Sequence, residues 1–262
     1  MNCLVPNVMP DVQGSRDERE LPIHRVGIRG VRYPVAWRGQ DGGVQHSVAQ
    51  FAFSVALPAE QKGTHMSRFH ELLESGLGPL DAATLAQLHD RMLERLDANE
   101  GTIELSFPFF VSKSAPVSGV SALMDYEVSL RADGPRGAAR VALKVLVPVT
   151  SLCPCSKSIA DYGAHNQRSH VTVTIEGEPM VDAAELVALI EAQASSELYG
   201  LLKRVDEKYV TERAYDNPKF VEDLVRDVAA SVARLPGVRH YVVEAENFES
   251  IHNHSAYARI ES

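Results

Sequence analysis

Apolar and polar side chains alternate with a period of two along several stretches of the chain, and this alternation predicts β-strands. The strands are expected at residues 24–37, 47–57, 102–111, 120–131, 138–149, 169–175, 240–246 and 255–260. Apolar residues spaced three and four apart predict helices at residues 66–74, 80–96, 182–202 and 218–235, with Asp81 as the N-cap of the second. The order strand–strand–helix–helix–strand–strand occurs twice. It predicts an α+β fold of two tandem β-β-α-α-β-β units with antiparallel sheets.

The segments that lack this periodicity set the boundaries of the two units. Residues 1–20 contain Pro, Gly and a charged run, and they predict a flexible N-terminal tail. The Gly- and Pro-containing segment at residues 133–137 predicts a turn or linker, so the first unit spans residues 21–134 and the second residues 135–262. The edge strands of each unit carry unpaired backbone groups that have to pair elsewhere, which predicts a homo-oligomer.

Composition and charge exclude several classes of protein. With 45% hydrophobic and 23% charged residues, the 262-residue chain is expected to fold rather than to stay disordered. Its 35 acidic residues against 26 Lys and Arg give a formal net charge of -9, which argues against a nucleic-acid partner held by a broad basic face. We recognise no signal peptide and no membrane span, and three cysteines cannot build a secreted disulfide framework, so a cytoplasmic location is expected.

The segment at residues 150–168 interrupts the predicted sheet and carries the densest set of reactive side chains. Cys153 and Cys155 directly follow a predicted strand, and His165 belongs to the same loop. A thiolate and an imidazole are S and N donors that zinc prefers. The C-P-C spacing is not the C-x-x-C of a zinc ribbon, so one of the two thiols is expected to bind a metal and the other to have a different role. The alternative, that both are small buried apolar residues, is disfavoured by the basic residues nearby, which stabilise thiolates.

Three further polar clusters have both a functional and an ordinary structural interpretation. Residues 244–254 contain three Glu and two His, which fits a ligand-bearing loop or a solvated turn. Residues 203–208 form a charge run that is typical of an exposed helix face. His65 and Arg68 lie at a predicted helix start, where backbone N–H groups favour anions, although the same segment fits an ordinary helix cap.

Four segments of the chain together resemble one known family. They read GTHMSRF (63–69), PVTSLCPCSKSIADYGAHNQRSH (148–170), LKRVDEKYVTERAYDNPKFVEDLVRDV (202–228) and ENFESIHNHSAYA (246–258). These segments are similar to those of the type IB GTP cyclohydrolases, the prokaryotic enzymes that make 7,8-dihydroneopterin triphosphate. The resemblance implies the tunnelling fold, in which β-β-α-α-β-β units pair their sheets across subunits, and a homotetramer with active sites at the subunit interfaces.

The same resemblance implies a metal-dependent hydrolysis. Family members hydrolyse GTP at C8 of the guanine, release formate and rearrange the ribose into a pterin ring, as the first step towards tetrahydrofolate and a queuosine precursor. By this resemblance Cys153, His165 and Glu207 surround one divalent ion, Zn2+ or Mn2+, and leave a coordination position for water. His252 is implied as a further ligand or a proton shuttle, with Glu249 as its orienting partner.

The resemblance also implies how GTP is held. Glu222 matches the residue that grips guanine, since a carboxylate accepts hydrogen bonds from both N1–H and the exocyclic amine. Cys155 matches another active-site position, where it would protonate or position the opening imidazole ring or keep the shape of the pocket. The triphosphate is an anion that needs cationic partners, and this requirement is the only basis for choosing its candidate ligands. The candidates are His65, Arg68, Lys113, Lys203 and Arg204.

The same residues fit two other functions. A nitrile reductase with the same type of fold also uses a cysteine and a glutamate around a guanine-like base, but it needs NADPH and a Cys nucleophile in place of a metal. A non-catalytic oligomer stabilised by zinc would have a closed site with four ligands. The extended GAHNQR and ESIHNH segments favour the metal-dependent cyclohydrolase.

Overall fold

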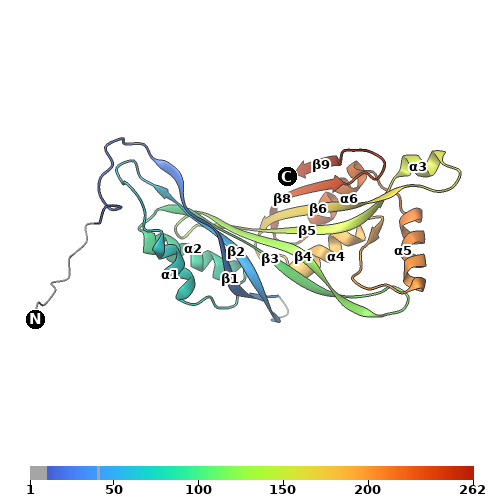
Figure 1. Ribbon diagram of the computed structural model, residues 1–262, viewed down its shortest axis with the longest axis horizontal. Helices are drawn as coiled ribbons and strands as arrows, with labels where there is room; N and C mark the ends of the chain where they lie inside the picture. The colour runs from blue at the N-terminus through green and yellow to red at the C-terminus, as the bar shows by residue number, and fades with distance from the viewer. Residues whose placement is uncertain (1–10, 40–41) are drawn as a thin grey trace, which may run out of the picture.

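The computed structural model describes residues 11–39 and 42–262, and its strands form one continuous antiparallel sheet (Figure 1). The strands lie in the order β1-β2-β3-β4-β5-β6-β8-β9, and the short β7 pairs with β5. They are β1 (Ile23–Arg38), β2 (Val44–Leu57), β3 (Glu100–Ser114), β4 (Ser121–Pro135), β5 (Arg140–Leu152), β6 (Asn166–Gly177), β7 (Ser196–Glu197), β8 (Val238–Asn247) and β9 (Ala256–Glu261). The helices are α1 (Ser67–Glu74), α2 (Ala82–Leu96), α3 (Pro154–Ile159), α4 (Ala183–Ala192), α5 (Arg204–Asp216) and α6 (Val221–Val232).

Apolar side chains on one face of the sheet pack against the helices and form the core. Phe51 and Phe53 of β2 are buried, and the Phe53 ring lies 6.0 Å from that of Phe69 in α1. In the second half, α4 packs on β5 and α6 packs on β8, with Val145 and Leu224 completely buried. Each large side chain of this kind stabilises the fold by about 1.5–3 kcal/mol when it leaves water. The inward-facing side chains thus hold both pairs of helices on the same sheet.

The predicted strands and the four predicted helices occur in the predicted order, and the two halves are joined by a turn within one sheet. β4 pairs with β5, and Asp133 lies opposite Arg140, so the sheet continues through the predicted boundary without a break. Residues 133–135, predicted as part of a turn or linker, belong to β4, and the turn is confined to residues 136–139. Pro135 is tolerated because it is the last residue of its strand, where a missing N–H donor costs the ladder little.

The helices of the second half differ from the prediction in three places. The helix predicted at residues 182–202 ends at Ala192, because the chain then turns and forms β7 beside β5. α5 is absent from the prediction because its buried residues are Asp206 and Ala214, so it lacks an apolar stripe. The short α3 lies in the segment that was expected to be irregular. No helix in the described part of the chain is long and apolar enough to cross a membrane.

Part of the segment predicted as a flexible tail is anchored to the rest of the chain. Residues 1–10 lie outside the described residues, whereas residues 11–20 are described. The Asp17 N–H donates to the Glu60 carbonyl at 2.9 Å. Such backbone bonds leave no apolar periodicity in the sequence, which is why the prediction missed them.

The tip of the β3–β4 hairpin reaches the start of α5 and meets a buried carboxylate. Asp206 accepts the N–H groups of Val117 and Ser118 at 2.9 and 2.8 Å, and the Ser118 hydroxyl at 2.6 Å. It also accepts the Lys203 N–H at 2.9 Å, which closes the first turn of α5. Burial by itself would raise the pKa of Asp206, but the hydrogen bonds from Ser118, Lys203 and Val117 outweigh it and hold the pKa well below its usual value.

Replacing Asp206 by Asn is expected to lower the melting temperature at neutral pH, because an amide nitrogen cannot accept the Ser118 and Lys203 hydrogens. The pKa is lowered in the folded state, so the carboxylate stabilises the fold fully above its ordinary pKa of about 4, and this stabilisation is lost as the pH falls further. The difference in melting temperature between the wild type and Asp206→Asn should therefore be largest near pH 7 and shrink in acid. A difference that stays constant down to about pH 3 would contradict this account.

Candidate functional site

The candidate site lies at the end of the β5–β6 hairpin, where Cys153 and His165 begin and end the connecting loop. In the register of the two strands, Leu152 pairs with Asn166, so the next residue of β5 and the residue before β6 are opposed. The Cys153 N–H donates to the His165 carbonyl at 3.1 Å and closes the loop. The hairpin therefore brings together the two residues that the sequence predicts as S and N donors.

The short α3 sets the surroundings of the two thiols. Cys153 is the N-cap of α3, Pro154 occupies its first turn, and the Cys153 Sγ accepts the Ser156 N–H at 3.5 Å. Both cysteines are free thiols, but Cys153 is half-buried and Cys155 is exposed. The two neighbouring thiols thus have different surroundings.

Three side chains hold His165 in place. Its Nδ1 lies 3.1 Å from Gln167 Oε1 and 3.2 Å from Ser250 Oγ. Its backbone N–H donates to Ser156 Oγ at 3.2 Å. Sequence reasoning missed these three residues. One signal was present for Gln167, a polar residue in phase with the buried positions of β6.

The loop between β8 and β9 brings the C-terminal polar cluster beside the β5–β6 loop. The Phe248 N–H donates to the Arg168 carbonyl at 3.0 Å, which anchors the start of this loop to β6. Ser250 then reaches His165, and Glu249 is half-buried next to it. The candidate ligand of this loop, His252, is exposed.

Two glutamates that the sequence predicts for the site lie near the N-termini of the two helices that follow β7. Glu207 lies in the first turn of α5 and Glu222 in the first turn of α6, and both side chains are exposed. The connection between these helices is tied to the site, because the Lys219 N–H donates to the Leu152 carbonyl at 3.0 Å. Figure 1 shows α3 and α5 at the same end of the molecule.

The donor types at this position fit a metal ion, but the described part of the chain brings no third donor beside them. Cys153 and His165 offer the S and N donors that suit zinc, and the contact with Gln167 is made at Nδ1 of His165, on the other side of the ring from Nε2. Within residues 11–39 and 42–262, no three Cys, His, Asp or Glu side chains converge closely enough to hold an ion. Glu207 and His252 belong to α5 and to the β8–β9 loop, two elements that contact the β5–β6 loop through other residues.

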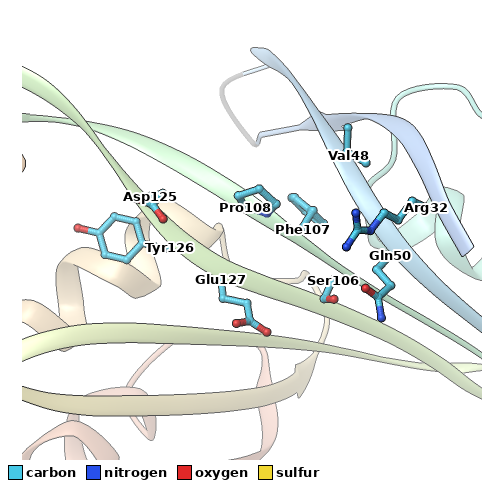
Figure 2. A pocket seen from close by; sticks show the side chains of 9 residues that line it. All are labelled: Arg32, Val48, Gln50, Ser106, Phe107, Pro108, Asp125, Tyr126 and Glu127. Carbon is cyan, nitrogen blue, oxygen red and sulfur yellow. The ribbon is translucent and has the colours of Figure 1, made fainter. Parts of the chain in front are cut away.

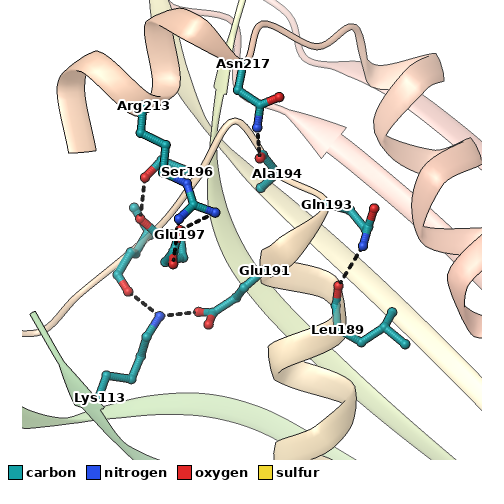
Figure 3. Close-up of polar contacts among 10 residues, drawn as sticks. Lys113, Leu189, Glu191, Gln193, Ala194, Ser196, Glu197, Arg213 and Asn217 are labelled. Atoms are coloured by element: carbon teal, nitrogen blue, oxygen red, sulfur yellow. Dashed lines mark hydrogen bonds and ion pairs between the residues drawn. The ribbon is translucent and has the colours of Figure 1, made fainter. Parts of the chain in front are cut away.

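Lys113, predicted to contact the triphosphate, belongs to a buried polar network (Figure 3). Its Nζ donates to Glu191 Oε1 and to the Leu198 carbonyl, both at 2.6 Å. The side chains of Lys113 and Glu191 are each 10% exposed. The Tyr126 hydroxyl donates to the same Glu191 oxygen at 2.7 Å, and burial together with this carboxylate raises the pKa of Tyr126. Lys113 therefore ties β3 to α4, with its ammonium group already bound.

The other cationic candidates form two groups at opposite ends of the molecule. His65 and Arg68 lie at the start of α1, whereas Lys203 and Arg204 lie at the start of α5 (Figure 1). The sheet separates the two groups along the longest axis of the molecule. They can meet around one ligand only when two copies of the chain come together.

A separate hollow lies over strands β1 to β4 (Figure 2). Its polar lining includes Arg32, Gln50, Asp125 and Glu127. Two carboxylates against one guanidinium do not suit a triphosphate. Of the residues that line this hollow, none was predicted for the site.

Comparison with known proteins decides the family. A model of the family described as "Type I GTP cyclohydrolase FolE2" matches residues 9–258 of the chain. The chain is 60% identical over 263 residues to the GTP cyclohydrolase FolE2 of Paraburkholderia phymatum, which covers 100% of this chain and 98% of that protein. It is 62% identical over 264 residues to that of Cupriavidus pinatubonensis, covering 100% and 97%. The chain belongs to the type I GTP cyclohydrolase FolE2 family. The family resemblance read from the four sequence segments is thereby confirmed.

Solved structures of low sequence identity share the fold of this FolE2 family member. The uricase of Arthrobacter globiformis has a TM-score of 0.50 at 9% identity, covering 91% of this chain and 92% of that chain. The urate oxidase of Bacillus sp. TB-90 has a TM-score of 0.50 at 8% identity, covering 92% and 99%. Urate oxidase has the tunnelling fold, so the predicted α+β tunnelling fold is confirmed. At this identity the likeness concerns the fold alone.

Replacing Lys113 by Met is expected to lower the free energy of unfolding by about 3–5 kcal/mol, because Glu191 would stay buried without its cation. The double variant Lys113→Met/Glu191→Gln should recover part of this loss, since it leaves no unpaired charge. Urea denaturation of the wild type and both variants measures the difference. A loss under about 1 kcal/mol in the single variant would contradict the structural role of Lys113.

Proposed function

We propose that the chain is a GTP cyclohydrolase that converts GTP and water to 7,8-dihydroneopterin triphosphate and formate, the first step of folate biosynthesis. The observation that carries this proposal is the family match, which spans the whole chain at 60% identity to a GTP cyclohydrolase FolE2. The hairpin loop supports it, because it places the S donor Cys153 beside the N donor His165. The same product would also supply a queuosine precursor.

The proposed reaction depends on a divalent metal, Zn2+ or Mn2+, with Cys153 and His165 as two of its ligands. Such an ion supplies a bound water that is acidic enough to react near neutral pH. Glu207 and His252 are the candidates for further ligands, since both lie exposed on segments that flank the β5–β6 loop. Free thiols in the site agree with a reducing, cytoplasmic setting.

Residues around the loop divide the remaining tasks. Glu222, exposed at the start of α6, is proposed to accept hydrogen bonds from guanine N1–H and the exocyclic amine. Adenine offers no such pair of donors, so this contact selects guanine. His252 is proposed to move protons to the purine nitrogens, with Glu249 orienting its ring. Cys155 on α3 is proposed to position or protonate the opening imidazole ring of the substrate.

The triphosphate is proposed to lie between cations of two subunits. Lys203 and Arg204 lie at the end of the molecule that carries α3, and His65 and Arg68 would come from another copy of the chain. Lys113 is set aside because it is bound within its own chain. Among the described strands, β1 and β9 form the two edges of the sheet. Exposed sheet edges tend to pair with other chains, which supports a homo-oligomer, proposed to be a tetramer with interfacial active sites.

Metal removal tests the proposed reaction. With GTP, the wild type should release formate and give a product that oxidises to a fluorescent pterin, and a chelator should abolish this turnover until Zn2+ or Mn2+ is restored. Cys153→Ala should lower metal-restored turnover by about 100-fold or more, with an unchanged melting temperature and oligomeric state. Turnover that survives complete metal removal would rule out the metal-dependent mechanism, and consumption of NADPH would favour the reductase.

Glu222→Gln should raise the KM for GTP by about 10- to 100-fold and weaken the choice of guanine, because the amide loses a charge-assisted acceptor. Initial rates with GTP measure the KM, and inosine triphosphate, which lacks the exocyclic amine, measures the selection. Glu212→Gln is the matched control, since Glu212 is an exposed glutamate of α5 that pairs with Lys208. An unchanged KM in Glu222→Gln would show that guanine is held elsewhere.

A further inference from the structure

A glutamine lies at an inward-facing position of β6. Val171, Val173 and Ile175 are buried on that face, and Gln167 continues the same two-residue period with only 7% of its surface exposed. A buried amide costs free energy unless it is hydrogen-bonded. In this structure its oxygen finds a partner in His165.

In the contact between Gln167 and His165, the structure assigns which atom donates the hydrogen bond and which accepts it. Gln167 Oε1 lies 3.1 Å from His165 Nδ1. With the amide oxygen of Gln167 facing the ring, as the structure places it, the proton of the neutral ring is assigned to Nδ1, because a carbonyl oxygen only accepts hydrogen bonds. Nε2 then carries the lone pair, which is the form in which an imidazole binds a cation. The two residues are two positions apart along the chain, which places both side chains on one side of an extended segment.

The main chain of His165 is fixed at both of its polar groups. Its N–H donates to Ser156 Oγ at 3.2 Å, and its carbonyl accepts the Cys153 N–H at 3.1 Å. Ser250 Oγ lies 3.2 Å from the same Nδ1, but Ser250 is exposed, so water competes for this contact. Gln167 is therefore the shielded partner of the ring.

We propose that Gln167 is a positioning residue that holds His165 in the Nδ1–H tautomer and so keeps Nε2 available as a metal ligand. The proposal rests on the proposed function, because it takes His165 as a ligand. Gln167 acts through His165 alone. A hydrogen bond of this kind fixes the tautomer and the orientation of a ligating ring and increases its basicity.

The test compares two replacements at position 167 with a matched control. Gln167→Leu removes the acceptor at similar size, whereas Gln167→Glu keeps an acceptor oxygen. Gln45→Leu is the control, because Gln45 makes two hydrogen bonds to the backbone of Phe110 between β2 and β3, at 2.9 and 2.8 Å. The control measures how much the zinc affinity changes when a hydrogen-bonded glutamine outside the site is lost.

Zinc affinity of the full-length protein, measured by competition with a chelator, is the first readout. Gln167→Leu should raise the Kd for Zn2+ by about 10- to 100-fold. Gln167→Glu should restore most of the affinity, and Gln45→Leu should leave it unchanged. An unchanged Kd in Gln167→Leu would overturn the proposal, as would equal losses in Gln167→Leu and Gln167→Glu, which a merely structural role would produce.

The tautomer itself is the second readout. Long-range 1H–15N spectra of the metal-free protein, labelled with 15N-histidine, should show His165 protonated at Nδ1 in the wild type and in Gln167→Glu, but shifted toward the Nε2–H form in Gln167→Leu. The His165 signal is the one missing from His165→Gln. An Nε2–H form in the wild type would overturn the proposal. A wild type that shows the Nδ1–H form and binds Zn2+ but leaves GTP intact would instead contradict the proposed function.

Discussion

The register of β5 on β6 is the constraint on which the candidate site depends. Val145 pairs with Val173 and Val147 with Val171, and all four side chains are completely buried. A slip by one residue would turn these valines to the opposite face of the sheet, at a cost of several kcal/mol. The same register opposes the two ends of the loop. Core packing in the middle of the hairpin therefore determines that Cys153 and His165 meet at its end.

The continuous sheet explains why the first half of the chain affects a site in the second half. The β3–β4 hairpin carries Ser118 to the buried Asp206, which fixes the start of α5. Lys113 of β3 binds Glu191 of α4, just before β7 pairs with β5. The helix that presents Glu207 is thus held by strands of the first half.

The sequence predicts the order of the strands and helices because buried positions recur at regular spacing. It fails where that periodicity is missing, as in α5, where the buried residues are an aspartate and an alanine. It also fails where tertiary contacts decide, as in the helix that ends at Ala192 so that the chain can pair with β5. The turn predicted near Pro135 lies at residues 136–139, and the sheet continues through it because β4 pairs with β5.

The same distinction between local sequence patterns and tertiary contacts applies to the residues of the candidate site. The sequence predicts Cys153 and His165 as candidates because both belong to one loop, and the structure opposes the two ends of that loop. The partners of His165 come from a buried strand position and from a distant loop, and no spacing in the sequence connects them. Lys113 was chosen for its charge, and only the structure places Glu191 beside it. Glu207 and His252 come from α5 and from the β8–β9 loop, and no spacing in the sequence connects either of them to the β5–β6 loop.

The central claim is that Cys153 and His165 bind the same metal ion. X-ray absorption spectroscopy of the zinc-loaded full-length protein tests it most directly, because it measures the ligand types and distances. The account predicts one sulfur at about 2.3 Å and at least one imidazole nitrogen at about 2.0–2.1 Å, with the sulfur lost in Cys153→Ser and kept in Cys155→Ser. A zinc shell made of nitrogen and oxygen alone in the wild type would contradict it.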